Sequence, residues 1–228
     1  MSFITLLNAR RTYSLPHGPL HAVDGVDLRI EAGDYLALAG PSGSGKSTLL
    51  NLLALLDDSS AGEHWWRGEL VSGAGEARRQ QARAGQIGYI FQRCHLIERY
   101  TVADNIGLGL NGDLRDAAER QRRIAALLAR YGLQHCAGLH PSQLSLGQQQ
   151  CVAICRAAIA QAPLLLADEP TAHLDARQAA QTMLLLRTLH QSGVTVVLAS
   201  HDTGIAAHAA RIVQLAAGRI VADAEYRR

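Results

Sequence analysis

The chain has 228 residues, of which 48% are hydrophobic and 18% charged, and its formal net charge is +2. This composition is ordinary for a globular protein with a real core, and the small net charge does not indicate a nucleic-acid-binding face. The N-terminus lacks a basic segment followed by an apolar one, and no apolar run reaches the about 20 residues that cross a bilayer. We therefore expect no signal peptide and no membrane span, so that any link to a membrane goes through a partner.

Short apolar runs alternate with helical patterns along most of the chain. Strands of a small antiparallel layer are predicted at residues 3–13 and 20–30. Continuous apolar runs, which are typical of strands buried on both faces of a parallel sheet, are residues 35–39, 87–91, 164–167 and 194–199. Helices are predicted at residues 46–56, 116–130, 145–160 and 175–190, and a final hairpin at 212–215 and 219–222.

This alternation predicts an α/β fold with a mostly parallel sheet and a small N-terminal antiparallel β layer. Residues 93–160 interrupt the alternation because they are mostly helical. We interpret them as a helical insert subdomain between the two parts of one α/β core, residues 1–92 and 161–228. The chain 1–228 is then a single domain.

The cysteines show neither a CxxC pair nor a metal-type spacing with histidine; they are Cys94, Cys136, Cys151 and Cys155. Cys151 and Cys155 are four residues apart and could share one helix face. A metal pair is conceivable there, but we expect two buried thiols. Free thiols are typical of a reducing compartment.

The strongest motif follows the predicted strand at 35–39. Residues 40–48 match the pattern GxxxxGK[ST] between a strand and a helix, which is the context that this phosphate-binding motif requires. Backbone N–H groups at a helix N-terminus attract phosphate, Lys46 can reach the β- and γ-phosphates, and Ser47 can ligate Mg²⁺. The predicted ATP-binding residues of this loop are Gly40, Pro41, Ser42, Gly43, Ser44, Gly45, Lys46, Ser47 and Thr48.

Two acidic residues end the apolar run at 164–167. Asp168 lies at the carboxyl edge of the predicted sheet, where α/β proteins bind their ligands, and is suited to hold Mg²⁺. Glu169 is suited to polarise an attacking water as a general base. Alone this run is a weak signal, but together with the glycine-rich loop it predicts a P-loop NTPase.

Residues 144–148, Leu-Ser-Leu-Gly-Gln, lie at a predicted helix start and resemble the LSGGQ signature of ABC transporter ATP-binding subunits. The resemblance covers the whole chain and implies the RecA-like P-loop NTPase core of that family. It also implies a homodimer, or a paired cassette, around two ATP molecules, in which Ser145, Gly147 and Gln148 contact the ATP held by the other subunit.

Other segments resemble further elements of the family. Gln92 is similar to the glutamine that contacts Mg²⁺ or the water and signals to the permease, and His201 to the switch histidine that contacts the γ-phosphate. Residues 172–175 resemble the D-loop, which crosses the dimer interface. Tyr13 resembles the aromatic residue that stacks on adenine, although an aromatic residue closing a strand is more often part of a core.

The resemblance thus implies an ATPase in which Glu169, His201, Lys46 and Gln92 are catalytic and Ser47, Gln92 and Asp168 hold the metal. The sequence departs from the family pattern at a few positions, namely Leu146, Ala172 and His173 in place of glycine, glycine and asparagine, and Cys151 and Cys155 in place of arginine and alanine. These departures leave the turnover rate and the dimer affinity open.

Residues 88–97 and 101–105 resemble one subgroup, the lipoprotein-release and macrolide-efflux ATPases with the related cell-division ATPase. This similarity implies an integral membrane permease as partner and a place on the cytoplasmic, inner face of the cell membrane. Two alternatives remain at this point: a nucleotide-gated module with weak or no hydrolysis, and a soluble ATPase of the same family acting on DNA or ribosomes. We expect no direct contact with nucleic acid.

Overall fold

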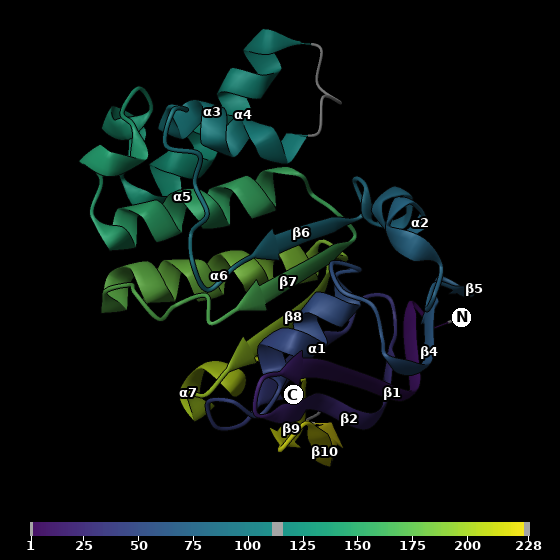
Figure 1. The fold of residues 1–228 in the computed structure, drawn as a ribbon. Coiled ribbons are helices and arrows are strands. Elements are labelled where there is room, and N and C mark those ends of the chain that lie inside the picture. Colours follow the sequence, from purple (N-terminus) through teal and green to yellow (C-terminus); the bar gives the residue numbers. More distant parts are fainter. Residues whose placement is uncertain (1, 111–115, 226–228) are drawn as a thin grey trace.

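The large sheet has the strand order β10-β9-β3-β8-β7-β6 in the computed structural model, which describes residues 2–110 and 116–225 (Figure 1). All neighbouring strands are parallel except β10, which pairs antiparallel to β9. The strands are β3 (Tyr35–Ala39), β6 (Ile87–Ile90), β7 (Leu164–Asp168), β8 (Thr195–Ser200), β9 (Arg211–Ala216) and β10 (Arg219–Glu225). Every residue of β7 and β8 is buried, which confirms the predicted parallel sheet.

The second sheet is antiparallel and has the order β2-β1-β4-β5. Its strands are β1 (Ile4–Leu15), β2 (Gly18–Ile30), β4 (Ala61–Trp66) and β5 (Glu69–Leu70). Only β1 and β2 were predicted, because β4 turns just two side chains, those of His64 and Trp66, into the core. Helix α2 (Gly75–Arg83) was also missed, since none of its residues is buried and it therefore lacks an apolar face.

Helix α1 (Lys46–Leu53) lies between the two sheets. Along β3, Leu36 and Leu38 face the core that contains α1, while Tyr35 and Ala37 face a second core on the other side of the sheet. This alternation follows the two-residue period of a strand. The prediction that α1 runs to residue 56 was wrong: the helix ends at Leu53, because the chain turns through a left-handed conformation at Leu55 (φ +56°).

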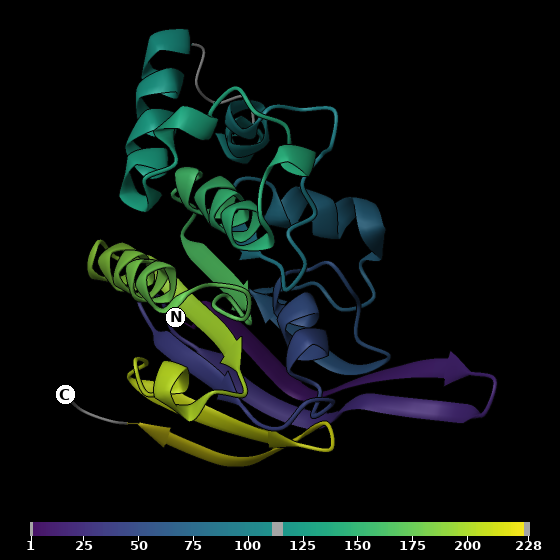
Figure 2. The same ribbon diagram turned by 90° about the vertical axis from the view of Figure 1, so that its left-hand side faces the viewer.

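The second core is covered by helices. These are α3 (Val102–Gly107), α4 (Ala117–Tyr131), α5 (Leu146–Ile159), α6 (Ala176–Gln191) and the short α7 (Thr203–Ala206), with 3₁₀ turns at Leu108–Leu110, Gln134–Cys136 and Pro141–Gln143. Figures 1 and 2 show α3 and α4 on the far side of α5 from the large sheet. Cys151 and Cys155 are fully buried free thiols, as predicted.

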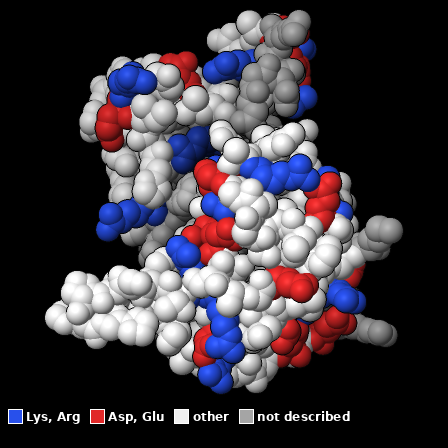
Figure 3. Space-filling model, turned by 45° about the vertical axis from the view of Figure 1, so that its right-hand side comes forward, with Lys and Arg blue, Asp and Glu red and all other residues white. Residues whose placement is uncertain are grey.

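Two negative findings apply to residues 2–110 and 116–225. No helix within these ranges is both long and apolar enough to cross a membrane. No cluster of three or more His, Cys, Asp or Glu side chains there could hold a metal ion. On the face drawn in Figure 3, acidic and basic side chains are interspersed rather than gathered into a large patch of one sign.

Candidate active site

The glycine-rich loop joins the carboxyl end of β3 to the first turn of α1, as the motif predicts. Gly45, just before the helix, has φ +102°, and a Cβ atom there would lie 2.2 Å from the backbone oxygen of Ala22. The loop therefore packs directly on β2 and requires glycine at this position. The Lys46 ammonium is buried and donates hydrogen bonds to the carbonyls of Gly40 (2.8 Å) and Pro41 (2.9 Å).

A cavity of about 400 Å³ opens beside this loop. Its lining combines loop residues with residues of β1, β2 and the β9–β10 turn, namely Tyr13, Leu20, His21, Ala22, Gly43, Gly45, Lys46, Ser47, Thr48, Ala217 and Gly218. The fold thus brings Tyr13 to the same cavity as the loop. The lining combines apolar and aromatic side chains with the glycine-rich loop and its lysine, which suits a nucleotide.

Two residues that sequence reasoning missed hold the Tyr13 ring. Its hydroxyl donates to the Asp57 carboxylate at 2.8 Å, and the Arg11 guanidinium lies 4.7 Å from the ring centroid. Arg11 also pairs with Asp57 at 2.7 Å. Asp57 follows the turn that ends α1, so no local pattern linked it to Tyr13. The arrangement fixes the ring at the cavity wall.

Asp168 ends β7 and is only 5% exposed. Burial raises the pKa of this carboxyl, while a hydrogen bond from Ser47 and the Lys46 charge act in the opposite direction. Its Oδ1 atom is buried and has no hydrogen-bond partner among the described residues. An acceptor without a partner, next to a serine of the phosphate loop, is what a Mg²⁺ ligand requires before the ion is bound.

Glu169 and His201 meet at the ends of β7 and β8. The Glu169 carboxylate accepts hydrogen bonds from His201 Nδ1 (2.8 Å), from the His201 backbone N–H (3.0 Å) and from the Ser200 hydroxyl (3.3 Å). Glu169 itself has φ +46°, an uncommon backbone conformation for a residue with a side chain. Such strain often occurs at functional sites, and here it turns the carboxylate toward His201.

The signature residues lie at the N-terminus of α5. Ser145 is its N-cap: its hydroxyl accepts from Gln148 N–H (3.3 Å), and the Gln148 side chain accepts from Ser145 N–H (2.9 Å). A Cβ atom on Gly147 would lie 3.1 Å from the His173 carbonyl oxygen, so the helix start packs against the predicted D-loop. The Leu146 side chain points outward and is 53% exposed.

Gln92 and Leu146 border a second groove of about 420 Å³. Its other lining residues are Arg93, Cys94, His95, Leu96, Glu98, Gln149 and His173. Within one chain, therefore, Gln92 and the signature residues do not line the cavity of the phosphate loop. Arg156 of α5, another residue that sequence reasoning missed, donates to the carbonyls of His95 (2.7 Å) and Cys94 (2.8 Å) and ties this segment to the signature helix.

A parallel sheet whose first buried strand leads through a GxxxxGK[ST] loop into a helix, with acidic residues ending a neighbouring strand, defines a P-loop NTPase. The family model described as ABC transporter matches residues 23–172. The chain therefore belongs to the ABC transporter family, and it is an ATP-binding cassette and ATPase of that family.

Individual relatives agree with this placement. The chain is 39% identical over 220 residues to a macrolide export ATP-binding/permease protein, MacB 2, of Yersinia pestis bv. Antiqua (strain Antiqua), covering 96% of this chain and 32% of that protein. It is 42% identical over 198 residues to the MacB protein of Agrobacterium fabrum, covering 87% and 31%. The chain thus spans about a third of the length of these relatives.

Solved structures are similar over the whole chain. The dimeric post-hydrolysis state of the ATP-binding cassette MJ0796, bound to ADP and Pi, superposes with a TM-score of 0.93 at 34% identity and covers 99% of both chains. A second dimeric structure of MJ0796, described as a bacterial ABC transporter cassette, has the same TM-score at 35% identity. The resemblance to macrolide-efflux cassettes is thereby confirmed, and neither alternative from the sequence is favoured.

Proposed function

We propose that the cavity beside the glycine-rich loop binds ATP, with its phosphates on residues 40–48 and its adenine against Tyr13. The observation that carries this proposal is the position of Asp168, a buried carboxylate with a free oxygen beside Ser47 and Lys46. The Lys46 ammonium now rests on two loop carbonyls, and a phosphate oxygen would replace them as its acceptor.

Mg²⁺ fits this donor set, because hydroxyl and carboxylate oxygens are its preferred ligands. Ser47 and Asp168 would hold the ion, and Gln92, which lines the separate groove, would have to move toward them to join as the third ligand. When bound, it neutralises charge on the phosphates of the nucleotide.

We assign the hydrolytic step to Glu169 and His201. The Glu169 carboxylate accepts two hydrogen bonds on Oε1 and one on Oε2, which leaves an acceptor position on Oε2 that can take a water proton as a general base. A carboxylate only accepts, so His201 Nδ1 is the donor in this pair. A protonated ring has a second N–H, on Nε2, which can stabilise charge that develops on the γ-phosphate.

We propose that two chains complete each site. Ser145, Gly147 and Gln148 lie apart from the cavity of their own phosphate loop, and the similar cassette MJ0796 is dimeric. A partner cassette in head-to-tail orientation would bring its signature helix to the γ-phosphate, where the N-terminus of α5 favours an anion. ATP then closes the dimer and hydrolysis opens it.

We further propose that the cassette drives an integral membrane permease. The relatives are named ATP-binding/permease proteins, and the groove at Gln92 offers a permease a lining in which leucines alternate with charged and polar side chains. The helical subdomain, residues 93–160, forms most of this surface. Such a partner would hold the chain at the cytoplasmic face of the cell membrane.

The Glu169→Gln variant tests the shared-site proposal, since it keeps the size of the side chain but removes the base. With ATP and Mg²⁺ it should elute from gel filtration as a dimer that retains uncleaved ATP. Glu119→Gln, on the surface of α4, is the matched control and should not trap a dimer. A monomer at all ATP concentrations would contradict the shared site.

A further inference from the structure

A third cavity lies at the amino-terminal end of the parallel strands, opposite to the end that carries the phosphate loop. It has a volume of about 210 Å³ and is lined by Tyr35, Arg187, His190, Gln191, His208 and Ala210. Tyr35 is the first residue of β3, whereas the phosphate loop follows the last residue of that strand. No residue is shared between the linings of this cavity and of the nucleotide cavity.

Tyr35 brings a buried hydroxyl to the lining of this cavity. The residue is 5% exposed, and its hydroxyl has no hydrogen-bond partner among the described residues. Burial raises the pKa of Tyr35 to about 12, although the Arg187 charge opposes the shift, so the phenol keeps its proton at neutral pH. A buried hydroxyl without a partner is costly, and because this oxygen has almost no exposed surface, it can donate to an acceptor in the cavity only after the lining side chains shift.

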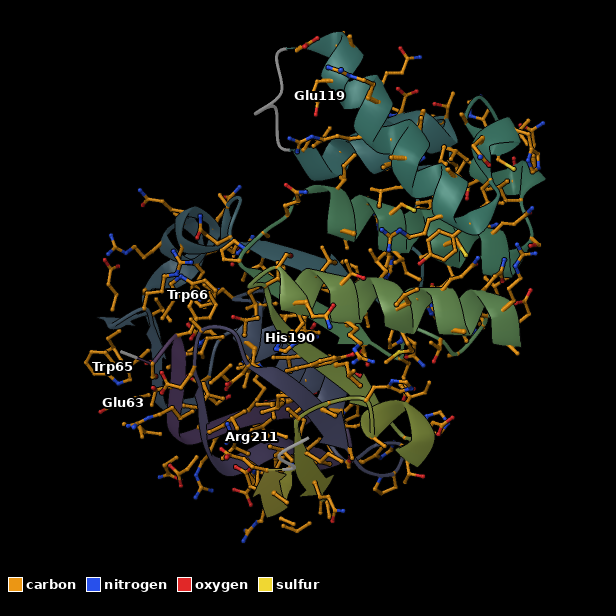
Figure 4. The ribbon with its side chains drawn as sticks, turned by 180° about the vertical axis from the view of Figure 1, so that it is seen from behind. Glu63, Trp65, Trp66, Glu119, His190 and Arg211 are labelled. Carbon is orange, nitrogen blue, oxygen red and sulfur yellow. The ribbon has the colours of Figure 1, made fainter. Side chains whose placement is uncertain are left out.

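The other polar side chains of the lining are those of Arg187, His190, Gln191 and His208, and the Gln191 amide carries both a donor and an acceptor. His190 Nε2 lies 2.9 Å from the Gly33 carbonyl oxygen and must therefore donate to it. The His190 ring packs at a tilt on Tyr35, with 5.2 Å between ring centroids, and Figure 4 shows His190 between α6 and the large sheet. The Arg187 guanidinium forms no ion pair within residues 2–110 and 116–225.

Among the residues that the structure describes, no acidic side chain lines the cavity. The nearest carboxylate in sequence, Asp34, accepts from the Glu31 backbone N–H at 2.9 Å and lies 3.8 Å from Arg211. A guanidinium, a phenol donor and two imidazoles therefore face one small space without a negative partner. This charge distribution favours a small anion over a cation or an apolar ligand.

We propose that this cavity binds a small oxyanion, phosphate or a short carboxylate, through Arg187 and the Tyr35 hydroxyl. A planar guanidinium offers two parallel N–H donors that match two oxygens of a phosphate or carboxylate. The volume exceeds that of several water molecules at roughly 30 Å³ each, which suffices for such an ion, but it is about half that of the nucleotide cavity. The imidazoles of His190 and His208 line the cavity and report on its occupancy.

The test is a titration followed by the imidazole NMR signals of His190 and His208. The protein is first saturated with a non-hydrolysable ATP analogue and Mg²⁺, so that the β- and γ-phosphate positions of the loop are filled, and then receives inorganic phosphate in one series and succinate in another. Saturable shifts of both imidazoles in either series support the site, and the series that saturates identifies phosphoryl or carboxylate as the favoured group.

Three variants make the test specific. Tyr35→Phe removes one oxygen atom and should weaken binding about tenfold, as expected for one hydrogen bond. Arg187→Gln should weaken binding more than tenfold, and because this side chain is exposed the variant should fold. Arg177→Gln, in the first turn of α6, is the matched control and should bind like the wild type.

Two results would overturn the proposal. One is the lack of a saturable shift with both probes, which would mean that the cavity holds only water. The other is binding of equal strength in the wild type and in Tyr35→Phe and Arg187→Gln. Neither result would affect the proposed ATPase function, because the phosphate loop is filled throughout the titration.

Discussion

Removal of the Tyr13 hydroxyl tests how the adenine-binding part of the nucleotide cavity is built. The Tyr13→Phe substitution keeps the ring for stacking but deletes the 2.8 Å hydrogen bond to Asp57. The ring would then be free in the empty site and would have to be ordered when nucleotide binds. Ordering one side chain costs about 0.5–1.5 kcal/mol, so ATP affinity should fall about two- to tenfold. Hydrolysis at saturating ATP should change little, because the hydroxyl bonds Asp57 and contacts neither Glu169 nor His201.

Fluorescent ATP-analogue titration and steady-state kinetics measure this effect. Asp57→Ala should weaken binding by a similar factor and should add little in the Tyr13→Phe background, since both changes remove the same bond. Tyr13→Ala should weaken binding more, because base stacking is worth about 1–3 kcal/mol. If Tyr13→Ala binds the nucleotide as tightly as the wild type, the reasoning is refuted and the ring is a core residue.

Three further predictions concern other parts of the molecule. His64 is buried, and burial lowers its pKa to about 4. The unfolded chain therefore binds a proton at higher pH than the folded one, so stability should fall as the pH drops from 6.5 toward 4, by about 3 kcal/mol in all. Urea unfolding across this range should show the loss in the wild type but not in His64→Gln. Gly45→Ala should lose nucleotide binding and about 1–3 kcal/mol of stability, measured by ligand titration and thermal unfolding, because its Cβ would collide with Ala22. Leu146→Gly should raise the hydrolysis rate of the dimer at a cost of about 1 kcal/mol in stability; an unchanged rate would mean that Leu146 does not crowd the shared site.

The sequence predicted the parts of the fold that rest on continuous apolar runs or on helical periodicity. The strand at 35–39 agrees with β3 to the residue, and Ser145 and Asp175 are N-caps of α5 and α6. Elements with few buried side chains were missed, such as β4 and α2, because periodicity is visible only where one face is buried.

The site shows the same division between local and long-range signals. The loop at 40–48 could be predicted because its chemistry lies in one continuous segment. Contacts between distant segments left no such pattern. The Tyr13–Asp57 bond joins residues 44 positions apart, and Arg156 reaches a carbonyl 61 positions away. Such contacts depend on which distant segments become neighbours in the fold, and a short sequence motif does not predict this.

The central claim is that this chain hydrolyses ATP with Glu169 as the base. The most direct measurement is phosphate release from ATP by the purified wild type and by Glu169→Gln, at equal protein and Mg²⁺ concentrations, alone and together with the proposed permease partner. The account predicts turnover in the wild type, and in the variant bound ATP with turnover reduced at least a hundredfold, the lower range for a general base. Equal turnover in both, or none in either with the partner present, would contradict it.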